Sequence, residues 1–498
     1  MRQAWLVVSL ASLILAAGCG GGSSSPPPSV TVSLSPSTAQ SITQAQTLNI
    51  TATVMNDSSN KGVSWNLSGV GSLTNSTITS VTYNAPATVS SNTTVTVTAT
   101  SIASTSAAAS LQITVTPPGS GSNVAPLSVD PGPADEYANG LFTSVTVCVP
   151  GSTSSCQTID GILVDTGSVG LRLLSSSAGG ALTLTLPQLN NPDSNPVAEC
   201  VQFADTSYIW GPVQTADIQI AGEKASAVPI NVLGDPGFST VPLSCSDTGG
   251  PDDDSLLAMG ANGILGVGLF EQDCGSACAS GTPPQAAYYE CPASGCVAAL
   301  VSLSQQVQNP VSLFAADNNG VIDNNGVIIE LPTASAPQST LSGSLVFGIG
   351  TQSNNALGGA MTFPVDGFGN FANPVVFNNQ SYSGSFIDSG SNGIYFLDSG
   401  TTGIPTCSDA TFFYCPGSSE VLNATNPGAN GATSTVQFTV GNADSMFGNN
   451  PNASVFPALA GPNTGSFDWG LPFFMGRNVF TAIEGKSTPA GSGPFWAY

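Results

Sequence analysis

The sequence predicts an all-β protein with more than one domain, and three observations support this prediction. Gly, Ser, Thr, Asn and Val dominate the composition, which favours strands and turns over helices. Apolar and polar residues alternate in several short segments, as they do in strands with one buried face. A ten-residue segment also occurs twice, at residues 165–174 and 388–397. The repetition suggests two lobes that face each other.

Chain length and net charge limit the number of domains and the classes of partner. The 498 residues leave room for about three domains of ~150 residues each. Six basic residues stand against thirty acidic ones, for a net charge of −24. This balance excludes a nucleic-acid partner, which would require a basic surface. The chain has no histidine, and this excludes Ser-His and Cys-His catalysis and most zinc sites.

Residues 1–18 have the pattern of an export signal, with Arg2 followed by an apolar run and small residues. Ala16-Ala17-Gly18-Cys19 resembles a bacterial lipoprotein processing site, which would make Cys19 lipidated and the first residue of the mature protein. An ordinary secretory signal is the alternative. We therefore expect a protein of the bacterial cell envelope that is anchored to the membrane at Cys19 and faces the periplasm or the exterior. Residues 19–29 form a Gly/Ser/Pro tether.

The eleven cysteines indicate an oxidising compartment. Without Cys19, ten remain, enough for five disulfides. Cys148 with Cys156 and Cys407 with Cys415 flank short turns, and Cys200 with Cys245 is the expected long bridge. Four further cysteines could form a metal site, but disulfides are favoured in an exported chain, and we expect neither a metal nor a cofactor. They are Cys274, Cys278, Cys291 and Cys296.

Changes in composition divide the remaining chain into three parts. Residues 30–117 contain several short alternating segments around a central Trp65 and resemble a bacterial immunoglobulin-like β-sandwich, for which a spacer role is expected. Residues 118–123 are a linker, and residues 124–498 form the main body. Its first lobe extends to about residue 300, and its second lobe begins near residue 310.

The repeated segment carries the chemistry. We call residues 165–174 the first Asp loop and residues 388–397 the second Asp loop; both read Asp-[Ser/Thr]-Gly-Ser-x-Gly and follow a strand-like approach. A carboxylate at the end of a buried strand is costly, so two such positions suggest a function. Asp247 and Asp398 begin the same tripeptide but lack an apolar segment on both sides. We expect these two to lie outside the site.

Residues 137–498 resemble the bilobal, pepsin-like aspartic peptidases. The likeness is carried, in chain order, by residues 162–168, 216–222, 262–268, 343–348, 386–391 and 473–481. The sequence is also similar to a group of uncharacterised bacterial exported proteins, a likeness that supplies no function. One departure is residues 469–472, Trp-Gly-Leu-Pro, which replace the second apolar-apolar-Gly segment of the family.

The resemblance implies that Asp165 and Asp388 share a proton. One would act as base on a water molecule while the other polarises the scissile carbonyl, and the sequence leaves the two roles open. The supporting residues that it implies are Gly167 and Gly390, which allow close approach, Thr166 and Ser389, which cross between the loops, and Ser168 and Ser391, which hydrogen-bond the outer carboxylate oxygens. The aromatic residue of the family's flap could be Phe203, Tyr208 or Trp210.

The predicted function is therefore that of an aspartic endopeptidase, expected to be a monomer, that hydrolyses an extended peptide or protein substrate in a cleft between the lobes. The alternative is a non-catalytic surface binding or adhesion protein on the same fold. We further expect Arg172 and Arg477 to form buried ion pairs with acids. Phe412, Phe413 and Tyr414 are expected to serve packing more than a pocket wall.

Overall fold

The computed structural model describes residues 29–498 except 39, 44–45, 87–88, 90–92, 117–122, 285 and 318–319. Strands dominate, and the helices are short, so the all-β prediction is confirmed. The predicted export signal, Cys19 and almost all of the tether lie outside the described residues. In the part of the chain that is described, no helix is both long and apolar enough to cross a membrane.

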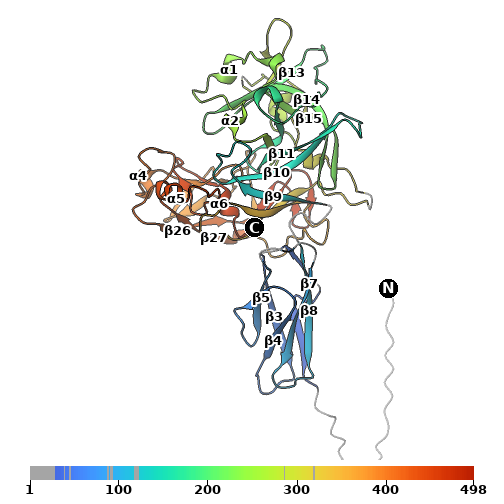
Figure 1. Ribbon diagram of the computed structural model, residues 1–498, viewed down its shortest axis with the longest axis vertical. Coiled ribbons are helices and arrows are strands. Elements are labelled where there is room, and N and C mark those ends of the chain that lie inside the picture. Colours follow the sequence, from blue (N-terminus) through green and yellow to red (C-terminus); the bar gives the residue numbers. More distant parts are fainter. Residues whose placement is uncertain are drawn as a thin grey trace, which may run out of the picture.

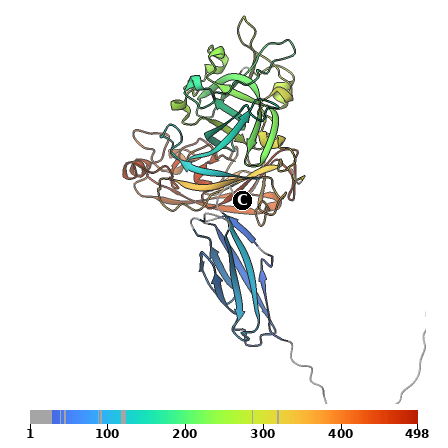
Figure 2. The same cartoon turned by 45° about the vertical axis from the view of Figure 1, so that its right-hand side comes forward.

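The N-terminal unit consists of two four-stranded sheets that share one core (Figures 1 and 2). One sheet has the order β1-β3-β6-β5 and the other β2-β8-β7-β4. Ile50, Tyr83, Val97 and Ile113 fill the space between them, because alternate residues of each strand point inward. The strands are β1 (Thr31–Ser35), β2 (Gln40–Thr43), β3 (Thr47–Met55), β4 (Val63–Ser68), β5 (Ser72–Thr74), β6 (Ser80–Asn84), β7 (Thr93–Ser101) and β8 (Ala108–Thr116).

Six strands of the main body close into a barrel. Their order is β14-β15-β12-β16-β11-β10, and pairing of β10 with β14 completes the ring. Closure removes free sheet edges and encloses an apolar interior that includes Val164, Leu171 and Leu265. The strands are β10 (Gly140–Cys148), β11 (Cys156–Asp165), β12 (Val169–Leu174), β14 (Tyr208–Ile220), β15 (Glu223–Leu233) and β16 (Gly263–Val267).

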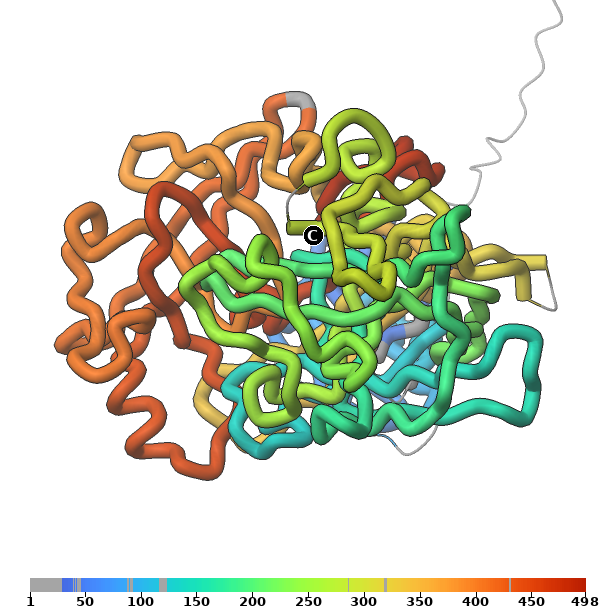
Figure 3. The backbone as a smooth tube through the Cα atoms, turned by 90° about the horizontal axis from the view of Figure 1, so that it is seen from above, coloured from blue at the N-terminus to red at the C-terminus, as the bar shows by residue number. Residues whose placement is uncertain are grey.

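The same sheet continues beyond the barrel through strands of the second half of the chain. Strand β9 pairs with β10 on one side and with β20 on the other, and β19, β30, β33 and β21 follow. Seen from above, the orange and red segments of the second half lie beside the green barrel (Figure 3). The strands are β9 (Val124–Asp130), β19 (Gly326–Glu330), β20 (Leu341–Phe347), β21 (Thr362–Pro364), β30 (Asn478–Ala482) and β33 (Phe495–Ala497).

Two smaller four-stranded sheets complete the second half. One has the order β24-β29-β25-β28 and the other β23-β22-β26-β27. Their strands are β22 (Val375–Phe377), β23 (Gln380–Tyr382), β24 (Phe386–Ile387), β25 (Ile394–Phe396), β26 (Glu420–Pro427), β27 (Thr433–Val440), β28 (Ala460–Gly461) and β29 (Phe467–Trp469). A cluster of aromatic rings that includes Phe396, Phe438, Phe467 and Trp469 packs between them.

The remaining elements are short. The other strands are β13 (Val197–Gln202), β17 (Tyr288–Glu290), β18 (Val297–Ala298), β31 (Ser487–Thr488) and β32 (Gly491–Ser492). The α-helices are α1 (Leu243–Ser246), α2 (Leu256–Met259), α3 (Ser276–Ala279), α4 (Ser399–Thr402), α5 (Ala443–Asn449) and α6 (Leu471–Phe474).

Five disulfides brace the body, as the sequence predicted. Cys148–Cys156 closes the β10–β11 turn, Cys407–Cys415 closes a loop of the second half, and Cys200–Cys245 is the long bridge. The remaining four cysteines pair as Cys274–Cys278 and Cys291–Cys296. Five disulfides are typical of a protein that works in an oxidising compartment outside the cytoplasm.

The two notable arginines behave differently. Arg172 is buried and its Nη2 lies 2.7 Å from Glu199 and 3.2 Å from Asp273, so the predicted ion pair is present. The ion pair predicted for Arg477 is wrong. Its guanidinium lies 4.6 Å from the centre of the Phe473 ring, and its Nη1 donates to the Phe473 carbonyl at 2.6 Å. Cation–π contact replaces the acid there.

Candidate active site

The two Asp loops occupy equivalent places in two copies of one strand arrangement. Asp165 ends β11, and Asp388 directly follows β24. In each copy a later strand lies between the two arms of the loop, parallel to the first arm and antiparallel to the second. This strand is β16 between β11 and β12, and β29 between β24 and β25. The buried inner strand holds both arms, so that each Asp sits at a fixed point.

The replacement of the second apolar-apolar-Gly segment leaves this arrangement intact. The Gly268 N–H donates to the Ser168 carbonyl at 2.9 Å, and the Leu471 N–H donates to the Ser391 carbonyl at 2.7 Å. Trp469 and the residues after it therefore hold the second loop as the segment after β16 holds the first.

The two loops approach each other through their glycines. A Cβ on Gly167 would lie 2.7 Å from the Asp388 Cγ, and a Cβ on Gly390 would lie 2.7 Å from the Asp165 Oδ1. Each glycine N–H also donates to the carboxylate of its own loop, at 2.7 Å for Gly167 and 2.8 Å for Gly390. The absence of a side chain at both positions allows each carboxyl to touch the opposite loop.

Reciprocal hydrogen bonds connect the loops. The Ser389 N–H donates to Thr166 Oγ1 at 2.9 Å, and the Thr166 N–H donates to Ser389 Oγ at 3.1 Å. The Ser389 hydroxyl in turn donates to the Val164 carbonyl at 2.8 Å, and the Thr166 hydroxyl to the Ile387 carbonyl at 3.4 Å. All of these groups are buried, so the hydrogen bonds are protected from water and fix the relative position of the loops.

The two support serines differ. Ser391 Oγ lies 2.8 Å from Asp388 Oδ2 and 2.7 Å from Asp468 Oδ2. Ser168 Oγ is buried and has no hydrogen-bond partner among the described residues. The environment of the two Asp residues is therefore asymmetric, although the sequence of the two loops is nearly the same.

The pKa of Asp388 reflects this asymmetry. Burial, the negative charge of Asp165 and the charge of Asp468 together raise the pKa of Asp388 well above its usual range. Hydrogen bonding with Asp165 acts in the same direction, whereas the Ser391 hydroxyl lowers this pKa. Burial and the neighbouring negative charges therefore favour the protonated form of Asp388.

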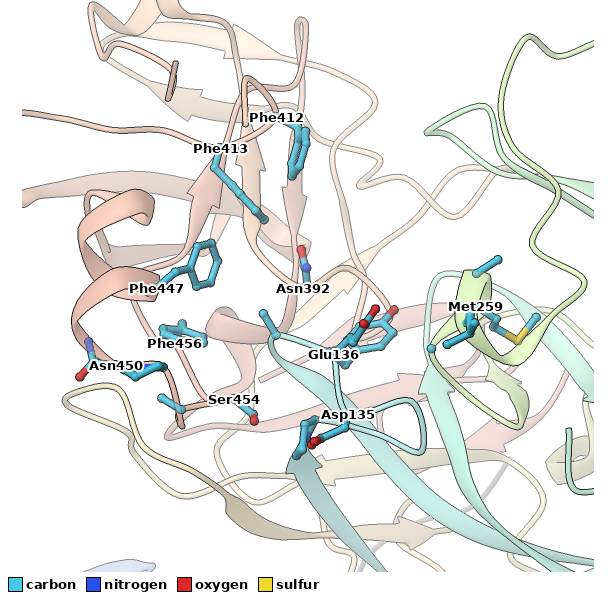
Figure 4. A pocket seen from close by; sticks show the side chains of 18 of the residues that line it. Asp135, Glu136, Met259, Asn392, Phe412, Phe413, Phe447, Asn450, Ser454 and Phe456 are labelled. Carbon is cyan, nitrogen blue, oxygen red and sulfur yellow. The ribbon is translucent and has the colours of Figure 1, made fainter. Parts of the chain in front are cut away.

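A pocket of about 870 Å³ adjoins the second Asp loop at Asn392, and neither Asp165 nor Asp388 is among its lining residues (Figure 4). Asp135 and Glu136 line one side, near Met259 of α2. Aromatic side chains from the second half line the other side; they are Phe412, Phe413, Phe447 and Phe456. The predicted packing role holds for Tyr414, which is buried in the core, and for Phe413, which is buried in an apolar cluster at the pocket wall; it is wrong for Phe412, which is exposed and lines the pocket.

None of the three flap candidates lines this pocket. They lie on the hairpin of β13 and β14, where Trp210 is buried against Tyr289 and donates from Nε1 to the Phe238 carbonyl at 2.8 Å. Phe203 packs on an apolar cluster with Ile209, and the backbone of Tyr208 pairs with residues 251–253. The turn of this hairpin contributes Asp205 to the pocket instead.

Tyr137 is the aromatic residue near the Asp pair that sequence reasoning missed. It lines the pocket, its ring packs edge-on against Phe142 at 5.6 Å, and burial and the charges of Asp165 and Asp388 raise its pKa. It precedes β10 in a segment without strand alternation, so no local pattern marks it. The neighbouring Asn139 is buried and donates from Nδ2 to the Asn392 carbonyl at 2.7 Å, which holds this segment on the second Asp loop.

The remaining predicted residues lie elsewhere. The side chain of Asp398 accepts the Thr401 N–H and caps α4, and Asp247 follows the last residue of α1. Neither residue lines the pocket. The carboxylate of Asp444 lies near Cys407 and Cys415, but the two sulfurs are joined in a disulfide and are not available as metal ligands.

Comparison with known proteins gives a family for the body. A family model described as "Protein of unknown function (DUF3443)" matches residues 119–498. The chain belongs to this family. The match covers both Asp loops and every strand from β9 onward. No curated protein matches the sequence.

Proposed function

We propose that the protein is an aspartic endopeptidase with a pepsin-like, bilobal body. The observation that carries the proposal is the reciprocal contact of the two Asp loops, in which each glycine faces the opposite carboxyl and Thr166 and Ser389 exchange hydrogen bonds. Two buried carboxyls in such contact cannot both ionise at low cost, so the pair holds one proton over a wide pH range.

In this proposal, the asymmetry of the site favours one assignment of the two roles. Asp388, whose pKa is raised, is the proton donor, and Asp165 is the base. Asp165 removes a proton from water as the water oxygen attacks the scissile carbonyl carbon, while Asp388 donates its proton to the carbonyl oxygen. The amide nitrogen of the resulting tetrahedral diol is then protonated by Asp165, the C–N bond breaks, and one hydroxyl proton of the diol returns to Asp388.

The substrate in this proposal is an extended peptide that lies along the pocket beside Asn392. The aromatic residues on one side of the pocket would accept apolar side chains, because burying their surface is favourable. The two N-terminal sheets would form an immunoglobulin-like spacer between this body and a membrane anchor at Cys19. This arrangement would present the pocket to proteins outside the cell or in the periplasm.

The test is hydrolysis of an unfolded, apolar-rich protein by the purified chain from pH 2 to 8, with and without the hydroxyl-containing inhibitor pepstatin. We expect a bell-shaped pH profile, inhibition by pepstatin and a loss of about 10³-fold in rate for Asp165→Asn. Circular dichroism of the variant checks that it is folded. Hydrolysis that survives Asp165→Asn would assign the chemistry to another site.

A second candidate, non-catalytic binding of peptide, is favoured by one observation. None of the three predicted flap aromatics lines the pocket, so no aromatic at those positions contacts a peptide bound in it. Binding of a peptide without hydrolysis at any pH by the folded protein would favour this alternative.

A further inference from the structure

A third carboxyl lies next to the Asp pair. Asp468 is on β29, the strand between the arms of the second Asp loop, and only 7% of its surface is exposed. Its Oδ2 lies 2.7 Å from Ser391 Oγ, and its Oδ1 is buried with no hydrogen-bond partner among the described residues. A buried carboxylate with an unpaired oxygen is costly, whereas a protonated carboxyl at the same place is not.

The number of hydrogen atoms constrains this arrangement. Ser391 Oγ is within hydrogen-bond distance of one oxygen of Asp388 and one oxygen of Asp468, at 2.8 Å and 2.7 Å. A serine hydroxyl carries one hydrogen and can donate to only one of the two carboxyls. Both contacts are satisfied only if one carboxyl is protonated and donates to Ser391 Oγ.

Asp468 is the better candidate for this donor. Asp388 faces Asp165, and its Oδ1 already accepts the Gly390 N–H. Asp468, in contrast, faces no basic group among its described contacts. The groups that act on Asp468 are Asp165, Asp388 and its cross-strand neighbour Tyr395. Burial and the charge of Asp165 raise the pKa of Asp468 to about 8, and the contact with the Ser391 hydroxyl acts in the opposite direction.

We propose that Asp468 is a positioning residue that stays protonated and, through Ser391, directs the proton of Asp388 toward Asp165. Asp468 donates to Ser391 Oγ, and the Ser391 hydroxyl then donates to Asp388 Oδ2. This outer oxygen is thereby occupied as an acceptor, and the proton of Asp388 is left on the inner Oδ1. Asp165 has no such chain, because the Ser168 hydroxyl has no hydrogen-bond partner among the described residues. The inference rests on the proposed function and adds a third carboxyl to that site.

The first experiment compares two substitutions of Asp468. Asp468→Asn keeps a permanent donor to Ser391 without a charge, whereas Asp468→Leu has a similar volume and no donor. We expect Asn to keep kcat within about 3-fold of the wild type below pH 7, and Leu to lower kcat about 10-fold or more with KM unchanged. Asp409→Asn, at an exposed loop position, is the matched control.

The outcomes separate three roles. Rescue by Asn but not by Leu supports a neutral donor. Equal loss in both variants would mean that the charge is needed, and no loss in either would mean that Asp468 only fills space; each overturns the proposal. If Asp468→Leu does not fold, Ser391→Ala takes its place. It is expected to lower kcat to a similar degree, with no further loss when combined with Asp468→Asn.

A second measurement does not depend on hydrolysis. Carboxyl carbon NMR of protein labelled at the Asp side chains should show a carboxyl that titrates near pH 8 and is absent from Asp468→Asn. Ser391→Ala should raise the pKa of Asp388, because the Ser391 hydroxyl lowers it. An unchanged Asp388 titration would overturn the proposal. If the wild type hydrolyses nothing but these titrations are as expected, the proposed function fails and the carboxyl chain stands.

Discussion

Gly167 and Gly390 are where the contact between the two Asp loops is most sensitive to substitution. Neither backbone lies in the left-handed region, so alanine is allowed conformationally and its methyl group is the only change. In Gly390→Ala that methyl would lie 2.7 Å from Asp165 Oδ1. We expect a loss of about 10²-fold in hydrolysis with the fold retained, because a small displacement of the carboxyls misplaces the water.

The control for this substitution is Gly417→Ala. A Cβ at Gly417 meets no atom within 4 Å, and its φ is not positive. Activity assays and circular dichroism on both variants distinguish a local clash from general destabilisation. Full activity in Gly390→Ala would show that the contact is not needed for the chemistry.

Asp398 tests whether the tripeptide alone is sufficient for function. Its side chain caps α4 by accepting the Thr401 N–H at 2.9 Å. Asp398→Asn should leave the rate of hydrolysis unchanged and lower the free energy of unfolding by at most about 1 kcal/mol, the usual range for a cap. Kinetics and thermal melting check both values. Loss of hydrolysis in Asp398→Asn, with Asp388→Asn still active, would mean that the wrong second loop was assigned.

Glu223 gives a prediction about stability and pH. This residue is buried, and burial together with the charge of Asp323 raises its pKa to about 7. The folded state therefore binds the Glu223 proton more tightly than the unfolded state, so the contribution of Glu223 to stability falls between about pH 4.5 and 7. We expect Glu223→Gln to raise the free energy of unfolding by about 1–3 kcal/mol at pH 8, and therefore the melting temperature, and to show no gain at pH 4. Melting curves at both pH values provide the measurement.

At the residue scale, sequence reasoning found the residues that stand in a recognisable local pattern. The residues that connect the two Asp loops are adjacent in sequence within each loop, as Asp165, Thr166 and Gly167 are. The repeated local pattern therefore marks the residues that make the contact. Asp468 and Tyr137 reach the Asp pair from strands or segments that are distant in sequence. No spacing within their own segments indicates that contact, and only the tertiary fold brings them there.

Among the elements, the loop that carries Phe412 and Phe413 offers a test of the pocket. Cys407–Cys415 closes this loop, and both aromatic residues line the pocket. Replacing both cysteines with serine should raise KM and leave the titration of the Asp pair unchanged, because the loop would lose order while the Asp loops keep their hydrogen bonds. Loss of the crosslink is expected to cost roughly 2–3 kcal/mol of stability.

The matched control removes a disulfide of equal span that does not adjoin the pocket lining. Cys148–Cys156 also joins residues eight apart and closes the β10–β11 turn, away from the pocket lining. Its double serine variant should lose a similar amount of stability without a change in KM. Equal changes in KM for the two variants would show that the effect is general destabilisation.

Strand alternation predicted several strands within residues 30–117, and it fails for a clear reason where strands are buried on both faces. Every residue of β12 and of β16 is buried, so neither strand shows the alternation of a half-exposed strand. The position of β29 between β24 and β25 was also not predicted, since residues 469–472 depart from the apolar-apolar-Gly pattern of the first copy. Pairing across more than 70 residues cannot be obtained from local periodicity.

For the whole molecule, the separate core of the two N-terminal sheets predicts an independent unit. Its buried residues form one cluster that is distinct from those of the body. A chain that begins at residue 123 should therefore keep kcat and KM within about 2-fold of the full chain, since no residue of the N-terminal sheets lines the pocket. Kinetics on the two chains provide the comparison, and loss of activity in the shorter chain would assign the N-terminal unit a role in the site.

The all-β class and five disulfides follow from the sequence, but the continuity of the sheet through the body does not. Strand β9 connects the barrel to β20, more than 200 residues later in the chain. The sequence indicates some of the strands, but the order in which they pair depends on the closed barrel and on side-chain packing between segments far apart.

The scarcity and placement of basic side chains also affect how long the protein would survive among other proteases. Enzymes that cut after Lys or Arg need an accessible residue in a chain that can be drawn out into an extended form. Among the described residues, Arg172 is enclosed by two acids, Arg477 stacks on Phe473, Lys486 is paired with Glu271, and Lys224 lies within strand β15. Lys61 is the exposed basic residue outside a strand, and it lies in the N-terminal unit. A trypsin-like enzyme would thus meet its first accessible target in the N-terminal sheets and leave the body intact.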